Sequence, residues 1–289
     1  MTEQSRPRVN RCIRAAGLAA VITSMAAAPA AADTPDVIRI AIAHLSPTPG
    51  AFASNTADIK QAIRVAHRHD AQWVLTGELA ESGYEFAGKV SPSSLPRYPD
   101  PWLRRIAAVS RRTGTTVFLG LPTRTGQTLH NAVVAIDEGR VVAQHAKVNV
   151  LSGPNENWAQ PGTDAVMHVD GVTIGYYVCA DAANRALTRS YQRQGAQILL
   201  SSAAWYPSRT MGPLPFWRSV TRRTGLPFVV ANTTGMKGSI DFRNSASGVF
   251  VNGVAVVKER ASRPRLVVVD WDRQQRRIKA VGTYRLDSD

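Results

Sequence analysis

Short apolar runs alternate with amphipathic stretches along most of this 289-residue chain, and this alternation limits the folds that it can adopt. Runs with the two-residue period or the short apolar length of β-strands lie at Val37–Ala43, Trp73–Thr76, Thr116–Leu121, Asn131–Ile136, Val141–His145, Val172–Val178, Ile198–Ser201, Phe228–Ala231, Ala246–Val251, Ala255–Lys258 and Leu266–Val269. Helical periodicity marks Thr56–Arg68, Trp102–Arg112, Asn184–Gln194 and Phe216–Arg223, with Gly114, Gly195 and Gly225 placed as helix stops. Turn residues at Asp137–Gly139 and Asn252–Gly253 predict hairpins. The pattern therefore predicts an α/β fold with mixed sheets.

The N-terminus differs from the rest of the chain. Arg6, Arg8, Arg11 and Arg14 precede an uncharged run, Ala15–Ala28, which is too short to span a bilayer comfortably. The small residues Ala30–Ala32 follow, in the pattern that a signal peptidase accepts. We expect residues 1–32 to be a signal peptide and the protein to be exported, periplasmic or secreted, without stable membrane insertion once the signal is removed. An uncleaved membrane anchor is the alternative.

Residues 33–289 are enough for one large domain, and no linker or repeat divides them. Removing residues 1–32 takes away four Arg and one Glu, so the formal net charge falls by 3 from +14 to +11. A basic surface can attract anionic partners. The Arg residues are scattered in pairs, however, and no nucleic-acid-binding motif accompanies them. We therefore expect a solvated basic surface and no nucleic-acid partner.

Cys179 is the one cysteine left after signal removal, so no intramolecular disulfide can form. Such a residue is either inert and buried or a working thiol. Cys179 and Glu78 each follow a predicted strand, and α/β folds place their sites at the carboxyl ends of strands. The first-turn amides of the helix expected after Cys179 should lower its thiol pKa below the ordinary value of about 8.5. Lys147 and Glu156 lie in the turn-rich segment after another strand.

The order and spacing of these residues resemble the carbon-nitrogen hydrolase (nitrilase) family. The segments that carry the resemblance are Gly77–Tyr84 (GELAESGY), Ala146–Val150 (AKVNV) with Glu156, and Gly175–Asp181 (GYYVCAD), and it extends from about Val37 to Lys258. It implies a four-layer α-β-β-α sandwich over residues 33–289. Gly77 replaces the usual Pro, Asn149 the usual His, Ala180 the usual aromatic residue and Arg185 the usual Pro. These departures leave the catalytic set intact but change the surroundings of the nucleophile.

The resemblance implies an amidohydrolase that cleaves a non-peptide C–N bond of a small-molecule amide, without cofactor or metal. Cys179 would be the nucleophile and form a thioester, Glu78 the general base, Lys147 the oxyanion-stabilising cation and Glu156 its orienting partner. Substrate-binding positions would be Tyr84, Ala180, Arg185 and Trp205. Arg185, six residues after Cys179, could pair with a substrate carboxylate. A homo-oligomer is compatible with the resemblance, since related proteins commonly pair across the helical face near the site.

Other thiol chemistries fit less well. No histidine lies in a recognisable protease context, and the sharp elbow of amidotransferases needs small residues where Tyr177 and Asp181 stand. No His/Asp cluster has the spacing of metal ligands. Two alternatives stay open: a catalytically silent binding protein with the same fold, and an enzyme that hydrolyses nitriles. The sequence leaves the substrate open among aliphatic amides, N-carbamoyl compounds and nitriles.

Overall fold

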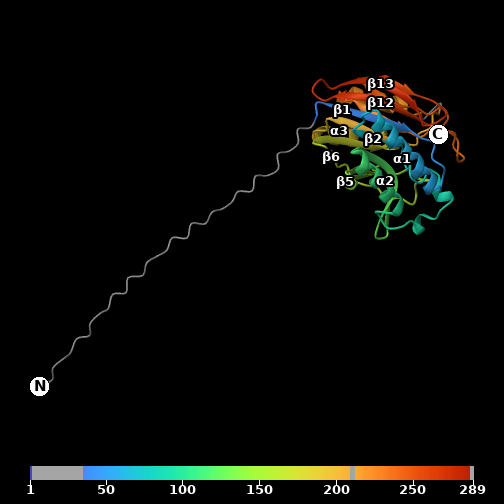
Figure 1. The fold of residues 1–289 in the computed structure, drawn as a ribbon, viewed down its shortest axis with the longest axis horizontal. Helices are drawn as coiled ribbons and strands as arrows, with labels where there is room; N and C mark the ends of the chain where they lie inside the picture. Colours follow the sequence, from blue (N-terminus) through green and yellow to red (C-terminus); the bar gives the residue numbers. More distant parts are fainter. Residues whose placement is uncertain (2–34, 209–211, 287–289) are drawn as a thin grey trace. The chain divides into compact units, whose positions relative to one another are not determined.

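The apolar runs of the sequence form two mixed β-sheets in the computed structural model, which describes residue 1 and residues 35–208 and 212–286 (Figure 1). The first sheet has the order β13 (Arg277–Arg285), β12 (Arg265–Asp272), β1 (Val37–His44), β2 (Trp73–Leu75), β3 (Thr116–Thr125), β4 (Thr128–Asp137) and β5 (Arg140–Ala146). The second has the order β11 (Val254–Glu259), β10 (Ser247–Val251), β9 (Phe228–Asn232), β8 (Ile198–Ala203), β7 (Val172–Val178) and β6 (Met167–Val169). In each sheet three central strands run parallel and the outer strands pair antiparallel. The predicted α/β class with mixed sheets is confirmed.

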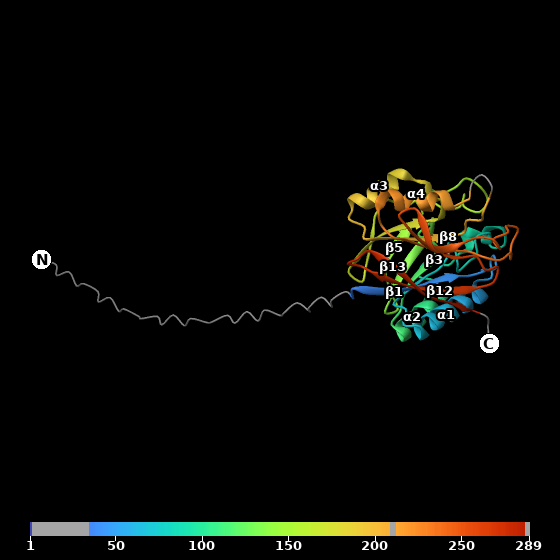
Figure 2. The ribbon, with the colours of Figure 1, turned by 90° about the horizontal axis from the view of Figure 1, so that it is seen from above.

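The helices cover the outer faces of the two sheets. They are α1 (Phe52–Arg68), α2 (Pro101–Thr113), α3 (Arg185–Arg193) and α4 (Leu214–Thr224), with short 3₁₀ turns at η1 (Phe86–Gly88), η2 (Pro92–Ser94) and η3 (Cys179–Ala183). Figure 2 shows α1 and α2 on one side of the sheets and α3 and α4 on the other, so the layers follow the order α-β-β-α. All of these elements belong to one unit, Thr34–Asp289, and the expected signal peptide lies outside the described residues.

Large apolar side chains from the inner faces of both sheets form the main core. Trp73 and Phe118 from the first sheet pack with Tyr176 and Phe228 from the second, and all four are fully buried. A second cluster lies under the outer helices, where Ile63 of α1 and Ile106 of α2 pack on the first sheet. Strands buried on both faces read as continuous apolar runs, which is why the sequence pattern located them.

The helix ends follow local signals. Asp100 caps α2, since its side chain accepts a hydrogen bond of 2.8 Å from the backbone N–H of Leu103, and Pro101 occupies the first turn. Gly114 and Gly225 end α2 and α4 in the left-handed conformation, with φ of 66° at both. Gly195 has φ of 77° just after α3. The predicted stops are thus confirmed.

Two strands of the structure were not predicted from the sequence. β6 has three residues, too few for a period to be visible. β13 is an edge strand whose residues are mostly exposed or half-buried and which carries Arg277, Lys279 and Arg285, so its sequence lacks an apolar face. Helix α1 also begins four residues before the predicted start at Thr56, because its first turn contains the exposed Ala53 and Ser54 and shows no apolar periodicity.

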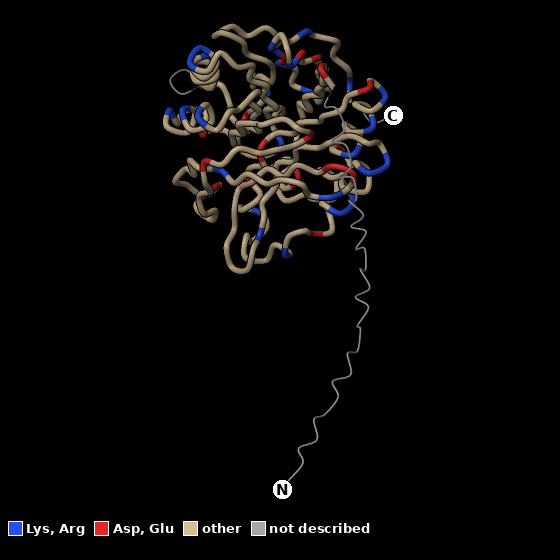
Figure 3. Tube along the Cα trace, turned by 90° about the vertical axis from the view of Figure 1, so that its left-hand side faces the viewer, with Lys and Arg blue, Asp and Glu red and all other residues tan. Residues whose placement is uncertain are grey.

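Charge is spread widely over the domain. Figure 3 shows Lys and Arg in many separate segments of the trace. The last turns of α2 and α4 each carry a pair, Arg111–Arg112 and Arg222–Arg223. No helix within residues 35–208 and 212–286 is long and apolar enough to cross a membrane. The absence of a nucleic-acid partner stays a prediction.

Candidate active site

Strand ends from both sheets bring the predicted catalytic residues together. Glu78 follows β2, Lys147 follows β5 and Cys179 follows β7, so three chain segments far apart in sequence meet at one edge of the sandwich. Glu156 comes from the turn-rich segment between β5 and β6. The ammonium Nζ of Lys147 lies 2.8 Å from Oε1 of Glu78 and 2.6 Å from Oε1 of Glu156. All three side chains are at most 1% exposed.

Three donors hold the carboxylate of Glu78. Besides Lys147, the side-chain amide of Asn131 donates to Oε1 at 2.8 Å, and the backbone N–H of Ala204 donates to Oε2 at 3.0 Å. A carboxylate that accepts three hydrogen bonds is held in its ionised form. Burial acts in the opposite direction. It outweighs the charge of Lys147, which lowers the pKa, so the pKa of Glu78 is raised. Glu78 is therefore a stronger base than an exposed glutamate.

Glu156 joins the lysine to the cavity wall. Its Oε1 also accepts a hydrogen bond of 2.8 Å from the hydroxyl of Tyr84, and its Oε2 accepts one of 2.9 Å from the backbone N–H of Leu151. Burial opposes the charge on Lys147, but the neighbouring negative charges, Glu78 first, outweigh it and raise the pKa of the ammonium group. Lys147 therefore stays cationic at neutral pH.

Cys179 occupies a strained turn directly after β7. Its φ is 50°, in the left-handed region that non-glycine residues seldom adopt, and its side chain faces the cavity although the residue is 4% exposed. The segment that follows is the short turn η3, and α3 begins only at Arg185.

The expected lowering of the thiol pKa is wrong. Burial and then the negative charge of Glu78 raise the pKa of Cys179 well above its ordinary value, although Lys147 and the backbone N–H of Ala204 act against this. The helix amides that were expected to lower it belong to a helix that starts six residues later. The resting thiol therefore keeps its proton, and attack on a substrate requires a base to remove it.

Asp181 was noted only as part of a motif, yet it fixes the relative positions of the cysteine and lysine segments. Its buried carboxylate accepts hydrogen bonds from the backbone N–H groups of Val178 at 3.0 Å, Val148 at 3.1 Å and Asn149 at 2.6 Å. The side chain of Asn149, the residue that replaces the usual His, donates to the carbonyl of Ala180 at 3.1 Å. Both contacts join the segment after β5 to the turn after β7.

Sequence reasoning missed Asn131, which holds Glu78 from β4. The residue is fully buried, and its carbonyl also accepts the backbone N–H of Lys147 at 2.8 Å. The signal available in the sequence was an amide at the start of an otherwise apolar run, Asn131–Ile136. Asn131 thus contacts both the base and the lysine segment.

Close backbone packing under Glu78 requires glycine. A Cβ atom added to Gly120 on β3 would lie 2.2 Å from the carbonyl oxygen of Gly77 and 3.0 Å from the backbone nitrogen of Leu79. No side chain can occupy that space without moving the segment that carries Glu78.

A second buried acid lies three residues beyond Glu78. Glu81 is fully buried, and no donor among the described side chains and backbone groups satisfies its carboxyl oxygens. Burial and the neighbouring Asp100 carboxyl raise its pKa well above the ordinary value. A buried carboxyl that lacks a donor and lies beside a second carboxyl favours its neutral form, so the folded protein retains the Glu81 proton.

We predict that Glu81→Gln stabilises the protein increasingly as pH rises. Below pH 4 the carboxyl is protonated in both the folded and the unfolded chain and the substitution changes little. Above the unfolded pKa of about 4.3, the unfolded chain releases a proton that the folded chain keeps, so the wild type loses about 1.4 kcal/mol per pH unit up to the raised folded pKa. Urea unfolding at pH 4 and pH 7 measures this difference. The exposed Glu138→Gln serves as the control, and a gain that does not depend on pH would contradict the prediction.

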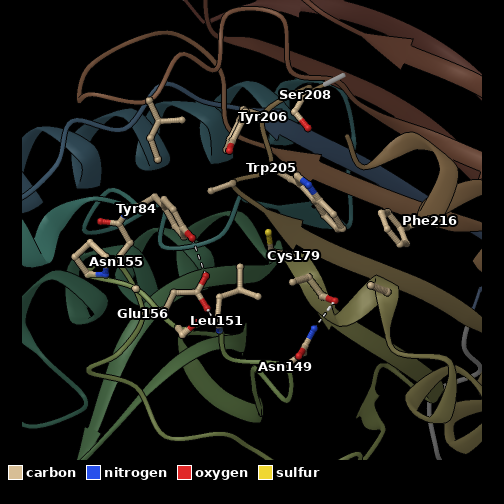
Figure 4. A pocket seen from close by; sticks show the side chains of 17 residues that line it. Tyr84, Asn149, Leu151, Asn155, Glu156, Cys179, Trp205, Tyr206, Ser208 and Phe216 are labelled. Carbon is tan, nitrogen blue, oxygen red and sulfur yellow. Dashed lines mark hydrogen bonds between the residues drawn. The ribbon is translucent and has the colours of Figure 1, made fainter. Parts of the chain in front are cut away.

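A cavity of about 470 Å³ opens above Cys179. Tyr84, Ala180 and Trp205, three of the expected substrate-binding residues, line it together with Glu156. Figure 4 shows the sulfur of Cys179 near the middle of the cavity, with Tyr84 and Glu156 on one side and Trp205 and Phe216 on the other. Glu78 and Lys147 are fully buried and are not among the residues that line the cavity.

Arg185 does not belong to this group. It is the first residue of α3, its side chain is exposed, and it is not among the residues that line the cavity. Asn184 caps the helix at this point, and the chain turns so that position 185 faces solvent. The expected pairing of Arg185 with a substrate carboxylate therefore has no support in the structure.

Comparison with known proteins agrees with this fold. The family model for carbon-nitrogen hydrolases matches residues 39–278, and the chain belongs to this family. A crystal structure of an amidase from Nesterenkonia is similar, with 25% identity and a TM-score of 0.71 over 83% of this chain and 93% of that one.

Two relatives with similar sequences are described as hydrolases. One, from Pseudomonas protegens, is 27% identical over 191 residues, which is 64% of either chain. The other, from Mycobacterium tuberculosis, is 27% identical over 193 residues, 60% of this chain and 68% of the relative. The chain thus spans about two thirds of the length of these relatives.

Proposed function

We propose that the protein is an exported thiol amidohydrolase that cleaves the C–N bond of a small amide through a thioester on Cys179. The observation that carries the proposal is a strained cysteine facing a cavity, beside a buried Glu78–Lys147–Glu156 cluster whose charges act on its thiol. A binding protein has no need of a buried lysine between two buried carboxylates, because desolvating such charges is costly.

In the first half-reaction Glu78 removes the proton of the Cys179 thiol as the sulfur attacks the carbonyl carbon of the amide. The C=O double bond becomes a C–O⁻ single bond, and Lys147 with the backbone N–H of Ala180 stabilises the oxyanion. When the carbonyl re-forms, the C–N bond breaks and Glu78 delivers its proton to the leaving nitrogen. Ammonia or an amine departs, and the acyl group remains on sulfur.

In the second half-reaction Glu78, again ionised, removes a proton from a water molecule that attacks the thioester. The C–S bond breaks, the carboxylic acid leaves and the thiol regains its proton. Glu78 thus serves in both halves, and its fixed position between three donors suits a group that must return to the same state. Glu156 holds Lys147 in place and receives no proton in this scheme.

Ammonia release from acetamide, an N-carbamoyl amino acid and a simple nitrile tests the reaction class. We expect release from at least one of the first two, and none from the Cys179→Ala variant. Exclusive action on the nitrile would favour nitrile hydrolysis, and no release from a wider amide panel would favour a catalytically silent binding protein. One amidase structure carries the acetamide moiety of fluoroacetamide on its active-site cysteine, so the same reagent is a direct probe of Cys179.

Export is a separate part of the proposal. We infer that residues 1–32 act as a signal peptide, because four Arg precede a short uncharged run that ends in Ala30–Ala32. Intact-mass measurement on the protein from the periplasm or medium should give a chain that starts at or near Asp33. A full-length chain in the membrane fraction would show that the segment is a retained anchor.

A further inference from the structure

Two aromatic rings form one wall of the cavity above Cys179. Trp205 follows β8, and Phe216 lies in the first turn of α4. Their ring centroids are 5.3 Å apart at an interplanar angle of 27°, a stacked arrangement, and both side chains are half-buried and line the cavity. The ring of Trp205 also contacts the fully buried Trp217 in an edge-to-face arrangement, with ring centroids 6.3 Å apart. The wall is therefore backed by the core.

The main chain of Trp205 is fixed in two directions by one side chain. Asn232, fully buried at the end of β9, accepts the backbone N–H of Trp205 at 2.9 Å and donates to its carbonyl at 2.9 Å. The same amide donates to the carbonyl of Ala246 at 3.1 Å. The preceding residue, Ala204, donates its N–H to Glu78. The position of the aromatic wall is thus tied to that of the general base.

The wall borders the cavity that the sulfur of Cys179 faces. Figure 4 places Trp205 and Phe216 on the side of the sulfur away from Tyr84 and Glu156. Among the described residues that line the cavity, Glu156 alone carries a charged side chain. Stacked aromatic faces favour planar apolar groups, and the described lining residues include no Lys or Arg that could pair with a substrate carboxylate.

We propose that Trp205 and Phe216 select substrates whose acyl group is an uncharged aromatic or other planar apolar group. The inference rests on the proposed amidohydrolase function and assigns the substrate class of the same site. The cavity of about 470 Å³ is of the size that holds small organic ligands.

The test compares three amides, 3-phenylpropionamide, butyramide and succinamate, on the wild type and on Trp205→Ala, Phe216→Ala and Trp205→Phe. The wild type should have the highest kcat/KM on 3-phenylpropionamide and the lowest on succinamate. Each alanine variant should lower the ratio of kcat/KM for 3-phenylpropionamide over butyramide about tenfold, because an aromatic contact and its buried area are lost. Trp205→Phe should keep most of that ratio, and Arg185→Ala, the control on α3, should leave it unchanged.

Equal ratios in the wild type and in both alanine variants, or a wild-type preference for succinamate, would overturn the inference while amide hydrolysis itself stood. Calorimetric binding of 3-phenylpropionamide and succinamate to Cys179→Ala separates the two claims, because it needs no turnover. Cys179→Ala should bind the aromatic amide more tightly than succinamate, and the further substitution Trp205→Ala should remove this difference. That result supports selection by Trp205 and Phe216 even if the wild type hydrolyses none of the three amides. Equal binding of both amides contradicts it.

Discussion

Cys179→Ser is expected to lower kcat by at least three orders of magnitude while the midpoint of thermal unfolding changes little. The substitution exchanges one sulfur for one oxygen on a residue that is 4% exposed, so packing is nearly conserved. A serine hydroxyl is a far weaker nucleophile than a thiol whose proton Glu78 removes, and loss of a nucleophile costs about 10⁶ in kcat where it has been measured. Steady-state ammonia release and a thermal melt measure the two effects.

The alanine variant at the same position provides the matching control. Cys179→Ala keeps the φ of 50°, which any L-residue finds strained. A similar loss of turnover in both variants with an unchanged melt would place the effect on the nucleophile and exclude an effect of the fold. Retained turnover in either variant would remove Cys179 from the mechanism.

Glu78→Gln is expected to lower kcat/KM by roughly 10² to 10⁴, the usual contribution of a general base. The amide occupies the same space beside Lys147, Asn131 and Ala204 but cannot accept the thiol proton. Burial, the largest cause of the raised pKa of Cys179, remains in this variant, so few thiolates exist without the base. Rapid-mixing measurements of the acylation burst test this step directly, and an unchanged burst would remove Glu78 from its role.

The pH profile adds an independent measurement on the same residue. Glu78 must be ionised to act, and its raised pKa means that activity is lost on the acidic side at a higher pH than an ordinary glutamate, with a pKa of about 4.3, would give. That acidic limb should be absent from the residual activity of Glu78→Gln. Glu81→Gln is the matched control, since this equally buried acid in the same segment belongs neither to the ion pairs of Lys147 nor to the charges that act on Cys179. The Glu81→Gln variant should keep the wild-type activity and the same loss of activity at acidic pH.

The sequence pattern located the strands because buried strands read as apolar runs, and the motifs placed Glu78, Lys147 and Cys179 after the correct strands. Strand β13 was not predicted because it is an exposed edge strand with charged residues, so its sequence lacks the apolar run that marks a buried strand. The two unpredicted supports, Asn131 and Asp181, act through contacts between segments far apart in the chain, 53 residues apart for Asn131 and Glu78 and 33 for Asp181 and Val148. No local pattern reports such contacts.

Two errors have the same physical origin. The prediction for Arg185 used its distance of six residues from Cys179, but the direction of its side chain depends on how α3 leaves η3. The prediction of a low thiol pKa used a helix dipole, but burial and Glu78 dominate the environment of Cys179. Distance in sequence indicated neither the direction of a side chain nor the balance of charges around a buried group.

In the proposed reaction Cys179 carries the acyl group of the substrate during turnover. Mass-spectrometric peptide mapping of acid-quenched reactions, sampled over successive quench times on the best amide found, tests it most directly. We expect a peptide containing Cys179 that gains the mass of the acyl group and loses it again as the amide is consumed. An acyl group on any other residue, or continued hydrolysis with Cys179 unmodified at every quench time, would contradict it.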